Sequence, residues 1–258
     1  MSRASRTVAT SSASTASVAG KAVFGSEGTE YVIGGTSGNR WALLDPSVTR
    51  VLSALLAIGG FVVSVLFFGL FTRKKHDLGP VKASRPTGFV LRRVWLLLGL
   101  LNLIFYFIGG IVPEWVYGTP LNLSFGGGEY LQWASVFITL SGALLFLWSG
   151  RVLGQYMRVE IVVSEKHELV TGGPYSRIRH PTYTGGLMID LGTALLFVNI
   201  ILVMSFVARV AMAYKRAGLE ETLLASEAGF GQRYRDYMGR TGKFLPKIGS
   251  SQRIRRSS

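Results

Sequence analysis

The 258-residue chain contains no cysteine. Disulfide bonds, thiolate nucleophiles, iron–sulfur clusters and cysteine-ligated zinc are therefore excluded, and so is palmitoylation or prenylation of the chain itself. Charged residues are also scarce, at 16% of the chain, against roughly 25% in soluble domains. Hydrophobic residues make up 48%. Few charges together with many apolar residues are typical of a membrane protein.

Acidic residues are fewer than basic ones, and the formal net charge is +14. On a soluble protein such a charge would favour nucleic-acid binding. Here the arginines and lysines stand between hydrophobic runs, where they set topology and contact anionic lipid headgroups. We therefore expect the membrane, and no nucleic acid, as a partner.

The start of the chain has few charges and little variety. No acidic residue precedes Glu27, and fourteen of the first twenty residues are Ser, Ala or Thr. We expect residues 1–45 to form a disordered arm. The composition also resembles a transit peptide, although the apolar core of a secretory signal is missing.

Five apolar runs follow the arm. Three of them, at about residues 48–71, 94–112 and 130–149, are long enough to cross a hydrocarbon core of about 30 Å. Two shorter runs, at about 182–197 and 200–214, are marginal for a full crossing, and the link between them leaves room only for a tight hairpin turn. The runs predict an all-α integral membrane protein with about five transmembrane helices. We divide it into four parts: the arm 1–45, three helices in 46–150, a catalytic region 151–248 and a basic tail 249–258.

The charges of the loops predict an orientation. Residues 73–93 carry seven basic side chains and one acidic, and residues 151–181 carry five and three. The chain from Lys215 onward carries ten basic and four acidic residues, whereas the loop 113–129 has no basic residue. Basic loops remain on the cytoplasmic side. We therefore expect the N-terminus outside and the C-terminus in the cytoplasm.

Functional groups are concentrated after the third apolar run. The stretch 167–186 holds two of the three histidines with two arginines and two tyrosines. It is too polar for lipid and too rich in glycine and proline to be helical throughout. A second polar block follows the hairpin, where Tyr234 and Tyr237 share one helix face because they are three residues apart. Since the hairpin returns the chain to the same face of the membrane, we predict a cytoplasmic site built from both blocks.

Both blocks carry motifs that resemble the isoprenylcysteine carboxyl methyltransferase family and the related membrane phospholipid methyltransferases. The first block reads His167-Glu168-Leu169-Val170, Gly173-Pro174-Tyr175 and Arg179-His180-Pro181-x-Tyr183-x-Gly185. The second reads Glu220-Glu221, Phe230-Gly231-x-x-Tyr234-x-x-Tyr237 and Pro246. The resemblance covers about residues 155–248, while the first two apolar runs match only as hydrophobic segments.

The resemblance implies an S-adenosylmethionine site formed by the two blocks, without a Rossmann domain and without a metal ion. In agreement, we find no G-x-G that follows a strand. The residues implied as cofactor contacts are His167, Leu169, Tyr175, His180, Tyr183, Glu220 and Glu221. Arg179 and Arg209 are the expected catalytic cations, because a carboxylate of the cofactor or of the substrate needs a cation.

The hairpin contains two charges, Asp190 and Arg209. They lie nine residues before Asn199 and ten residues after it, so they are at similar depth and could pair. An ionisable residue inside the membrane is a functional candidate. Two interpretations remain open: an ion pair that fixes the hairpin, or a substrate-binding role in which Arg209 holds the substrate carboxylate.

The resemblance implies methylation of the C-terminal carboxylate of a prenylated cysteine, in the endoplasmic reticulum of a eukaryote or the inner membrane of a bacterium. A phospholipid amine or another small lipophilic acceptor is the alternative, because both groups of enzymes share the motifs. Membrane sterol reductases have a similar block that binds NADPH. They typically carry a glutamate after RHP-x-Y-x-G, where this chain has Gly186. A non-catalytic membrane scaffold would not need the polar blocks intact.

Overall fold

The computed structural model describes residues 22–24, 30–32, 44–72, 78–85, 88–123, 127–157 and 160–247. The chain separates into two compact units, Met1–Asn39 and Arg40–Ser258. In the first unit, strand β1 (Ala22–Phe24) pairs with the antiparallel strand β2 (Glu30–Val32). The predicted basic tail and most of the predicted disordered arm lie outside the described residues.

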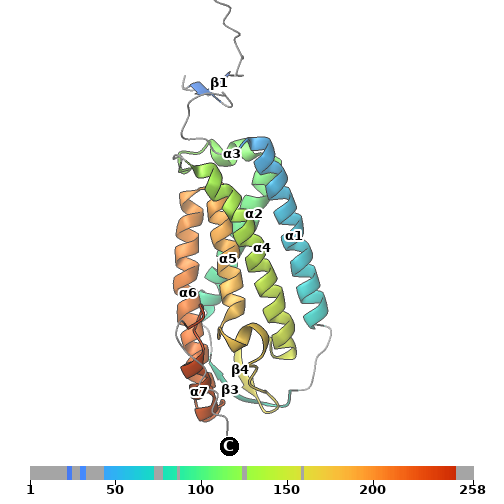
Figure 1. Ribbon diagram of the computed structural model, residues 1–258, viewed down its shortest axis with the longest axis vertical. Helices are drawn as coiled ribbons and strands as arrows, with labels where there is room; N and C mark the ends of the chain where they lie inside the picture. The colour runs from blue at the N-terminus through green and yellow to red at the C-terminus, as the bar shows by residue number, and fades with distance from the viewer. Residues whose placement is uncertain are drawn as a thin grey trace, which may run out of the picture. The chain divides into compact units, whose positions relative to one another are not determined.

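The second unit is a helical bundle. Its helices are α1 (Pro46–Thr72), α2 (Phe89–Ile111), α3 (Pro113–Tyr117), α4 (Gly128–Leu153), α5 (Pro181–Phe197), α6 (Ile200–Leu224) and α7 (Gln232–Arg240), with 3₁₀ turns η1 (Gly154–Tyr156) and η2 (Gly173–Ser176). Figure 1 shows α4, α5 and α6 side by side. The short helix α3 lies at one end of this bundle, and α7 lies at the other end with the strands β3 (Val81–Arg85) and β4 (Ile161–Ser164).

Two stretches of the described chain are long and apolar enough to cross a membrane, judged by length and composition. They are Arg92–Ile111, with a mean hydropathy of 2.2, and Gly128–Tyr156, with a mean hydropathy of 1.7. Only 17% of the most apolar part of the first stretch is buried inside the protein, which suits a helix in contact with lipid. The protein is thus mostly helical with two helices of this kind, and the predicted crossings by α1, α5 and α6 stay predictions.

The protein contains a short sheet, which the prediction of an all-α protein did not include. Strand β3 (Val81–Arg85) pairs antiparallel with β4 (Ile161–Ser164). Both strands lie in segments expected as polar loops, and they are too short for an alternating pattern to be recognised. Ile161 and Val163 are buried in a cluster with Leu223 of α6. The sheet therefore attaches the connection between α1 and α2 to the segment that leads into residues 167–186.

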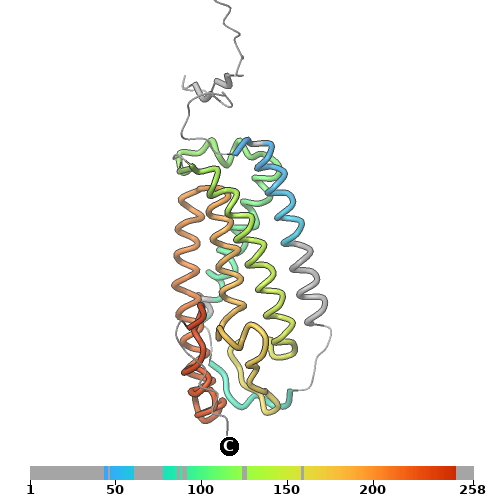
Figure 2. Tube along the Cα trace, in the orientation of Figure 1, coloured from blue at the N-terminus to red at the C-terminus, as the bar shows by residue number. Residues whose placement is uncertain are grey.

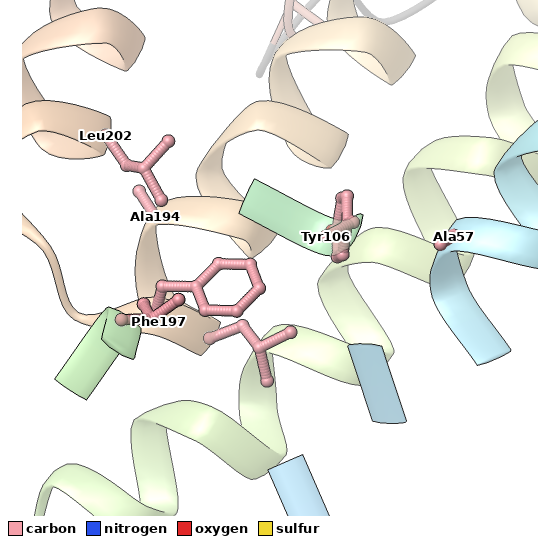
Figure 3. Packing of buried hydrophobic residues seen from close by; sticks show 7 residues of the cluster. Ala57, Tyr106, Ala194, Phe197 and Leu202 are labelled. Carbon is pink, nitrogen blue, oxygen red and sulfur yellow. The ribbon is translucent and has the colours of Figure 1, made fainter. Parts of the chain in front are cut away.

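The predicted tight turn between α5 and α6 is present. Val198 adopts a left-handed conformation at φ 46°, and the Asn199 side chain accepts a hydrogen bond of 3.0 Å from the backbone N–H of Ile201, which caps the start of α6. The trace in Figure 2 has this turn at the same end of the bundle as α3. Phe197 fills the core beside the turn, among Tyr106, Ala194 and Leu202 (Figure 3).

Helices α4 and α5 approach closely through small residues. A Cβ atom added to Gly185 would lie 2.7 Å from the carbonyl oxygen of Gly142, and one added to Gly142 would lie 2.8 Å from the carbonyl oxygen of Gly185. Both contacts involve backbone, which cannot move aside without separating the helices. Small residues at such contacts let helix backbones pack directly, as in membrane helix pairs. The motif glycine Gly185 therefore serves helix packing.

Candidate functional site

A cavity of about 470 Å³ lies within the second unit, in the size range of about 300–1,000 Å³ that is usual for small-molecule sites. Side chains from α2, α4, α5, α6 and α7 contribute to its wall, together with β4 and the segment 167–180. Of the ten predicted site residues, eight line this wall: His167, Leu169, Tyr175, Arg179, His180, Tyr183, Arg209 and Glu220. The other two, Asp190 and Glu221, each bind an arginine of the wall.

His180 lies between the two adjacent glutamates of α6. Its Nδ1 is 3.4 Å from Glu220 Oε2, and its Nε2 is 3.2 Å from Glu221 Oε1. The histidine directly precedes α5, which begins at Pro181, and its side chain is buried. Burial by itself would lower the pKa of His180, but hydrogen bonds to the two glutamates and their charges outweigh burial and raise this pKa. The ring is therefore held in a site that favours its protonated form.

Glu221 is surrounded by cations. One oxygen accepts a hydrogen bond of 2.7 Å from Arg179 Nε, and the other lies 3.0 Å from Lys243 Nζ. Burial would raise the pKa of Glu221, but hydrogen bonds from His180, Arg179 and Lys243 lower it to about 2. The carboxylate is consequently ionised at any physiological pH.

Arg179 also fixes the chain that follows α7. Its Nη1 donates to the carbonyl oxygens of Thr241 and of Met238, the latter at 3.2 Å. Nε and Nη1 of this predicted catalytic arginine are thus engaged by the protein itself. Arg179 joins α6, the end of α7 and the start of α5, which is the geometry of a cross-link.

Glu220 extends the network toward the cavity. Its Oε1 accepts a hydrogen bond from the Tyr183 hydroxyl, and Arg216 Nε lies 3.5 Å from the same oxygen. Arg216 also donates to the Tyr183 hydroxyl at 2.6 Å. The rings of His180 and Tyr183 stack with their centroids 5.5 Å apart. We call the set His180, Glu220, Glu221, Arg179, Lys243, Tyr183 and Arg216 the ionic network.

Aromatic side chains form another part of the wall. His167 stacks on Tyr156, with ring centroids 4.7 Å apart, and meets the edge of Phe230 at 5.5 Å. The hydroxyl of Tyr175 is buried, lies near Thr182 and makes no well-formed hydrogen bond to any described residue. A buried donor of this kind normally has a partner, and Thr182 is the described side chain beside it.

The predicted face-sharing tyrosines of α7 are part of this wall. Both Tyr234 and Tyr237 are buried. The Tyr237 hydroxyl donates a hydrogen bond of 2.6 Å to the backbone carbonyl of Tyr175. This bond ties α7 to the turn η2 and so fixes the position of the Tyr175 ring.

The two charges of the hairpin form an ion pair. Arg209 Nε lies 2.5 Å from Asp190 Oδ2, and the Asn102 amide donates to the other oxygen of Asp190 at 2.5 Å. Arg209 Nη1 donates to the carbonyl oxygen of Trp95 at 3.0 Å, and the guanidinium lies 4.2 Å from the centre of the Trp95 ring. Within the described chain, Arg209 Nη2 has no partner. We call Asp190 and Arg209 the inner pair, and Asn102 and Trp95 support it.

Helix α2 matched the family only as a hydrophobic segment. Its support of Arg209 through Trp95 and of Asp190 through Asn102 was therefore missed. One signal was available, because Asn102 is the one side-chain amide in the run 94–112, and a polar side chain inside an apolar span normally bonds to another helix. The contact through the Trp95 carbonyl left no signal, since a backbone acceptor does not depend on residue type.

The fold and the site together define a class of protein. It is a membrane-type helical bundle with a buried ionic network beside a cavity. Residues 135–226 match the model of the isoprenylcysteine carboxyl methyltransferase (ICMT) family. This matching region runs from within α4 to just beyond α6, and it confirms the resemblance seen in the motifs. The match ends before α7 and does not include α2, so Trp95 and Asn102 lie outside it.

Curated relatives agree with the family. The chain is 35% identical over 145 residues to the protein-S-isoprenylcysteine O-methyltransferase of Tribolium castaneum, which covers 53% of this chain and 50% of that protein. It is 34% identical over 91 residues to protein-S-isoprenylcysteine O-methyltransferase B of Arabidopsis thaliana, covering 35% of this chain and 45% of the relative. The chain thus spans about half the length of the curated relatives it matches.

A solved structure is also similar. It is that of the eukaryotic intramembrane Ras methyltransferase ICMT, with a TM-score of 0.48 and 20% sequence identity. The similarity covers 80% of this chain and 69% of the solved one.

Proposed function

We propose that the protein is a membrane methyltransferase that uses S-adenosylmethionine to methylate the C-terminal carboxylate of a prenylated cysteine. One observation carries the proposal: a single cavity joins the ionic network of the RHP-x-Y-x-G and Glu220-Glu221 motifs to a buried arginine, Arg209. The names of the curated relatives, both protein-S-isoprenylcysteine O-methyltransferases, support this acceptor over a phospholipid amine.

The residues of the ionic network suit the proposed cofactor. S-adenosylmethionine carries an ammonium and a sulfonium charge, and Glu220 with Glu221 supplies two carboxylates held ionised by their partners. Tyr175, His167 and Leu169 offer ring and apolar surface in the cavity wall. When bound, the cofactor supplies a methyl group on a sulfonium, which is a good electrophile without further activation.

The acceptor places a modest demand on the protein. A C-terminal carboxylate has a pKa of roughly 3.5, so it is ionised near neutral pH and needs no general base. The protein must hold it in line with the methyl group and exclude water. In our proposal, Arg209 holds the acceptor carboxylate through Nη2, while Asp190 tempers the attraction so that the carboxylate stays nucleophilic. Arg179, whose Nε and Nη1 are engaged, positions the network.

The proposed acceptor site at Arg209 and the proposed cofactor site at Glu220 lie at different depths of the hairpin. Arg209 precedes Glu220 by eleven residues on α6, which is about 16 Å along a helix that rises 1.5 Å per residue. We propose that the lipid tail of the acceptor enters from the bilayer and that the cofactor enters from the cytoplasm. The charges of the loops support five transmembrane helices, an outer N-terminus and a cytoplasmic cofactor site. The membrane would be the endoplasmic reticulum of a eukaryote or the inner membrane of a bacterium.

Binding and transfer test the proposal separately. The full chain is purified in detergent, its affinity for radiolabelled S-adenosylmethionine is measured, and transfer to N-acetyl-S-farnesylcysteine is followed. We expect both, and we expect Arg209→Ala to lower kcat/KM for the acceptor by about a hundredfold, the loss of a strong charged contact. Its cofactor affinity should stay unchanged.

The matched control for this variant is Arg50→Ala. Arg50 forms a pair of 2.9 Å with Glu114 at the opposite end of the bundle, and both side chains are exposed. Its replacement should change neither quantity. A protein that does not bind the cofactor contradicts the methyltransferase proposal, and one that binds it but transfers only to a phospholipid amine contradicts the prenylcysteine acceptor.

A further inference from the structure

Two adjacent glycines of α5 have opposite surroundings. A Cβ atom at Gly185 would meet the backbone of α4 at 2.7 Å, whereas a Cβ atom at Gly186 would have no neighbour within 4 Å. Gly186 is part of the cavity wall. Its backbone is that of an ordinary right-handed helix, so no left-handed conformation demands glycine there. Packing and backbone geometry therefore explain Gly185 and leave Gly186 unexplained.

The position of Gly186 on the helix gives it a place between the two ionic sites. Thr182, Tyr183 and Gly186 all line the cavity, because residues three and four apart share one face of a helix. The next residue on this face, four positions further, is Asp190, which holds Arg209. The face thus leads from the ionic network at Tyr183 to the inner pair at Asp190. Gly186 is the one member of it without a side chain.

A glycine inside a helix lowers stability relative to alanine. Gly186 should lower the stability of α5 in this way, although no close contact requires a glycine at this position. What its missing side chain provides is open space in the cavity between the two ionic sites.

We propose that Gly186 is a specificity-determining residue: the absence of a side chain there keeps open the path by which a bulky acceptor carries its carboxylate to Arg209. This inference rests on the proposed function, since it concerns the acceptor of the same site. A larger residue at this position would narrow the path and leave the cofactor contacts of His180 and Glu220 in place. The size of side chain tolerated at position 186 therefore sets which acceptors the enzyme uses.

Substitutions of graded size test this directly. We expect Gly186→Ala to lower kcat/KM for N-acetyl-S-farnesylcysteine measurably and Gly186→Leu to lower it by about tenfold or more, because a single excess methylene already has an effect of this size in a fitted pocket. Cofactor affinity should stay the same in both. Gly218 is the matched control, because it also lies inside a helix with nothing within 4 Å of an added Cβ but is not in the cavity wall. Gly218→Ala and Gly218→Leu should leave transfer unchanged.

The chain has no cysteine, so Gly186→Cys creates a unique thiol for a second measurement that does not depend on catalysis. We expect the thiol to react with a small methanethiosulfonate reagent. A farnesylcysteine analogue at ten times its Kd should slow this reaction about tenfold, because only about a tenth of the sites then stays free to react. S-adenosylmethionine alone should not slow it. Gly218→Cys should react at a rate that neither ligand changes.

The outcomes separate the inference from the proposed function. Full acceptor activity in Gly186→Leu, or labelling of Gly186→Cys that the acceptor does not slow, overturns the inference while the methyltransferase activity stands. Loss of cofactor binding in Gly186→Leu also overturns it, because the residue would then belong to the cofactor site. Wild-type protein that neither transfers a methyl group nor binds the farnesylcysteine analogue overturns both.

Discussion

Helices α5 and α6 carry two ionic sites that are built differently. In the ionic network, two carboxylates share three cations and a histidine, so that Glu221 alone contacts His180, Arg179 and Lys243. In the inner pair, Asp190 faces one cation, Arg209, and one amide, Asn102. Each carboxylate of the network thus has more than one charged partner, whereas the carboxylate of the inner pair has one.

This difference in construction predicts a difference in role. Charges inside a helical bundle are costly unless they are paired and hydrogen-bonded. In a network, the loss of one partner leaves others to compensate, so its members can exchange contacts with a ligand. In a lone pair, each charge depends on the other, so its members should matter more for folding. The comparison therefore assigns cofactor binding mainly to the network, and it gives the inner pair the larger structural dependence in addition to the acceptor binding proposed for Arg209.

The largest expected effect is on the inner pair. Asp190→Ala leaves the buried Arg209 without its carboxylate, and breaking a buried pair typically costs about 3–5 kcal/mol. Thermal unfolding in detergent should show a lower midpoint, whereas Arg50→Ala, which removes an exposed pair, should lose at most about 1 kcal/mol. The double variant Asp190→Leu/Arg209→Met should recover much of the lost stability, because no unpaired charge remains. Similar small losses in Asp190→Ala and Arg50→Ala would erase the distinction between the two sites.

A smaller effect is expected in the network, and mainly on the cofactor. Glu221→Ala should weaken S-adenosylmethionine binding by about tenfold, or 1.4 kcal/mol, because Arg179, Lys243 and His180 lose their shared acceptor. Its unfolding midpoint should fall less than that of Asp190→Ala. Glu227→Ala, which removes an exposed carboxylate after α6, is the control for both measurements. Unchanged cofactor affinity in Glu221→Ala, measured by equilibrium binding, would remove the network from the proposed site.

The two sites also differ in how far the sequence could predict them. The motif residues around His180 and the pair Glu220-Glu221 could be assigned to one site, because an apolar hairpin must return the chain to the same face. The similar distances of Asp190 and Arg209 from the turn likewise indicated that they could pair. Helix positions and turn length carry this kind of information.

The parts that could not be predicted depend on contacts without a pattern in the chain. Arg179 binds the carbonyl oxygens of Met238 and Thr241, and any residue would present the same oxygen. Strands β3 and β4 are short, and each gains its identity only from a partner far away in sequence. Trp95 is an aromatic residue of an apolar run, and only the packing of α2 against α6 brings it to Arg209. These contacts depend on burial and on pairing between distant parts of the chain, which the periodicity of the sequence does not show.

The smallest expected effect is a dependence of stability on pH that comes from the network. The pKa of His180 is raised in the folded protein by Glu220 and Glu221 in spite of burial, so its contribution is complete below its unfolded pKa of roughly 6.5 and is lost as the pH rises through the raised value. The pKa of Glu221 is lowered to about 2, so its contribution is complete above roughly 4.3, the ordinary value for glutamate, and is lost as the pH falls toward the lowered value.

The network should therefore contribute most between these two ordinary values, at about pH 4.3 to 6.5. Unfolding midpoints of the wild type and of His180→Gln, measured in detergent from pH 6 to 9, isolate the histidine. The wild type should lose stability with rising pH more steeply than the variant, since the neutral amide cannot lose a proton. Parallel curves would mean that His180 is not held by charge, and the network would then resemble the inner pair in depending on fixed geometry.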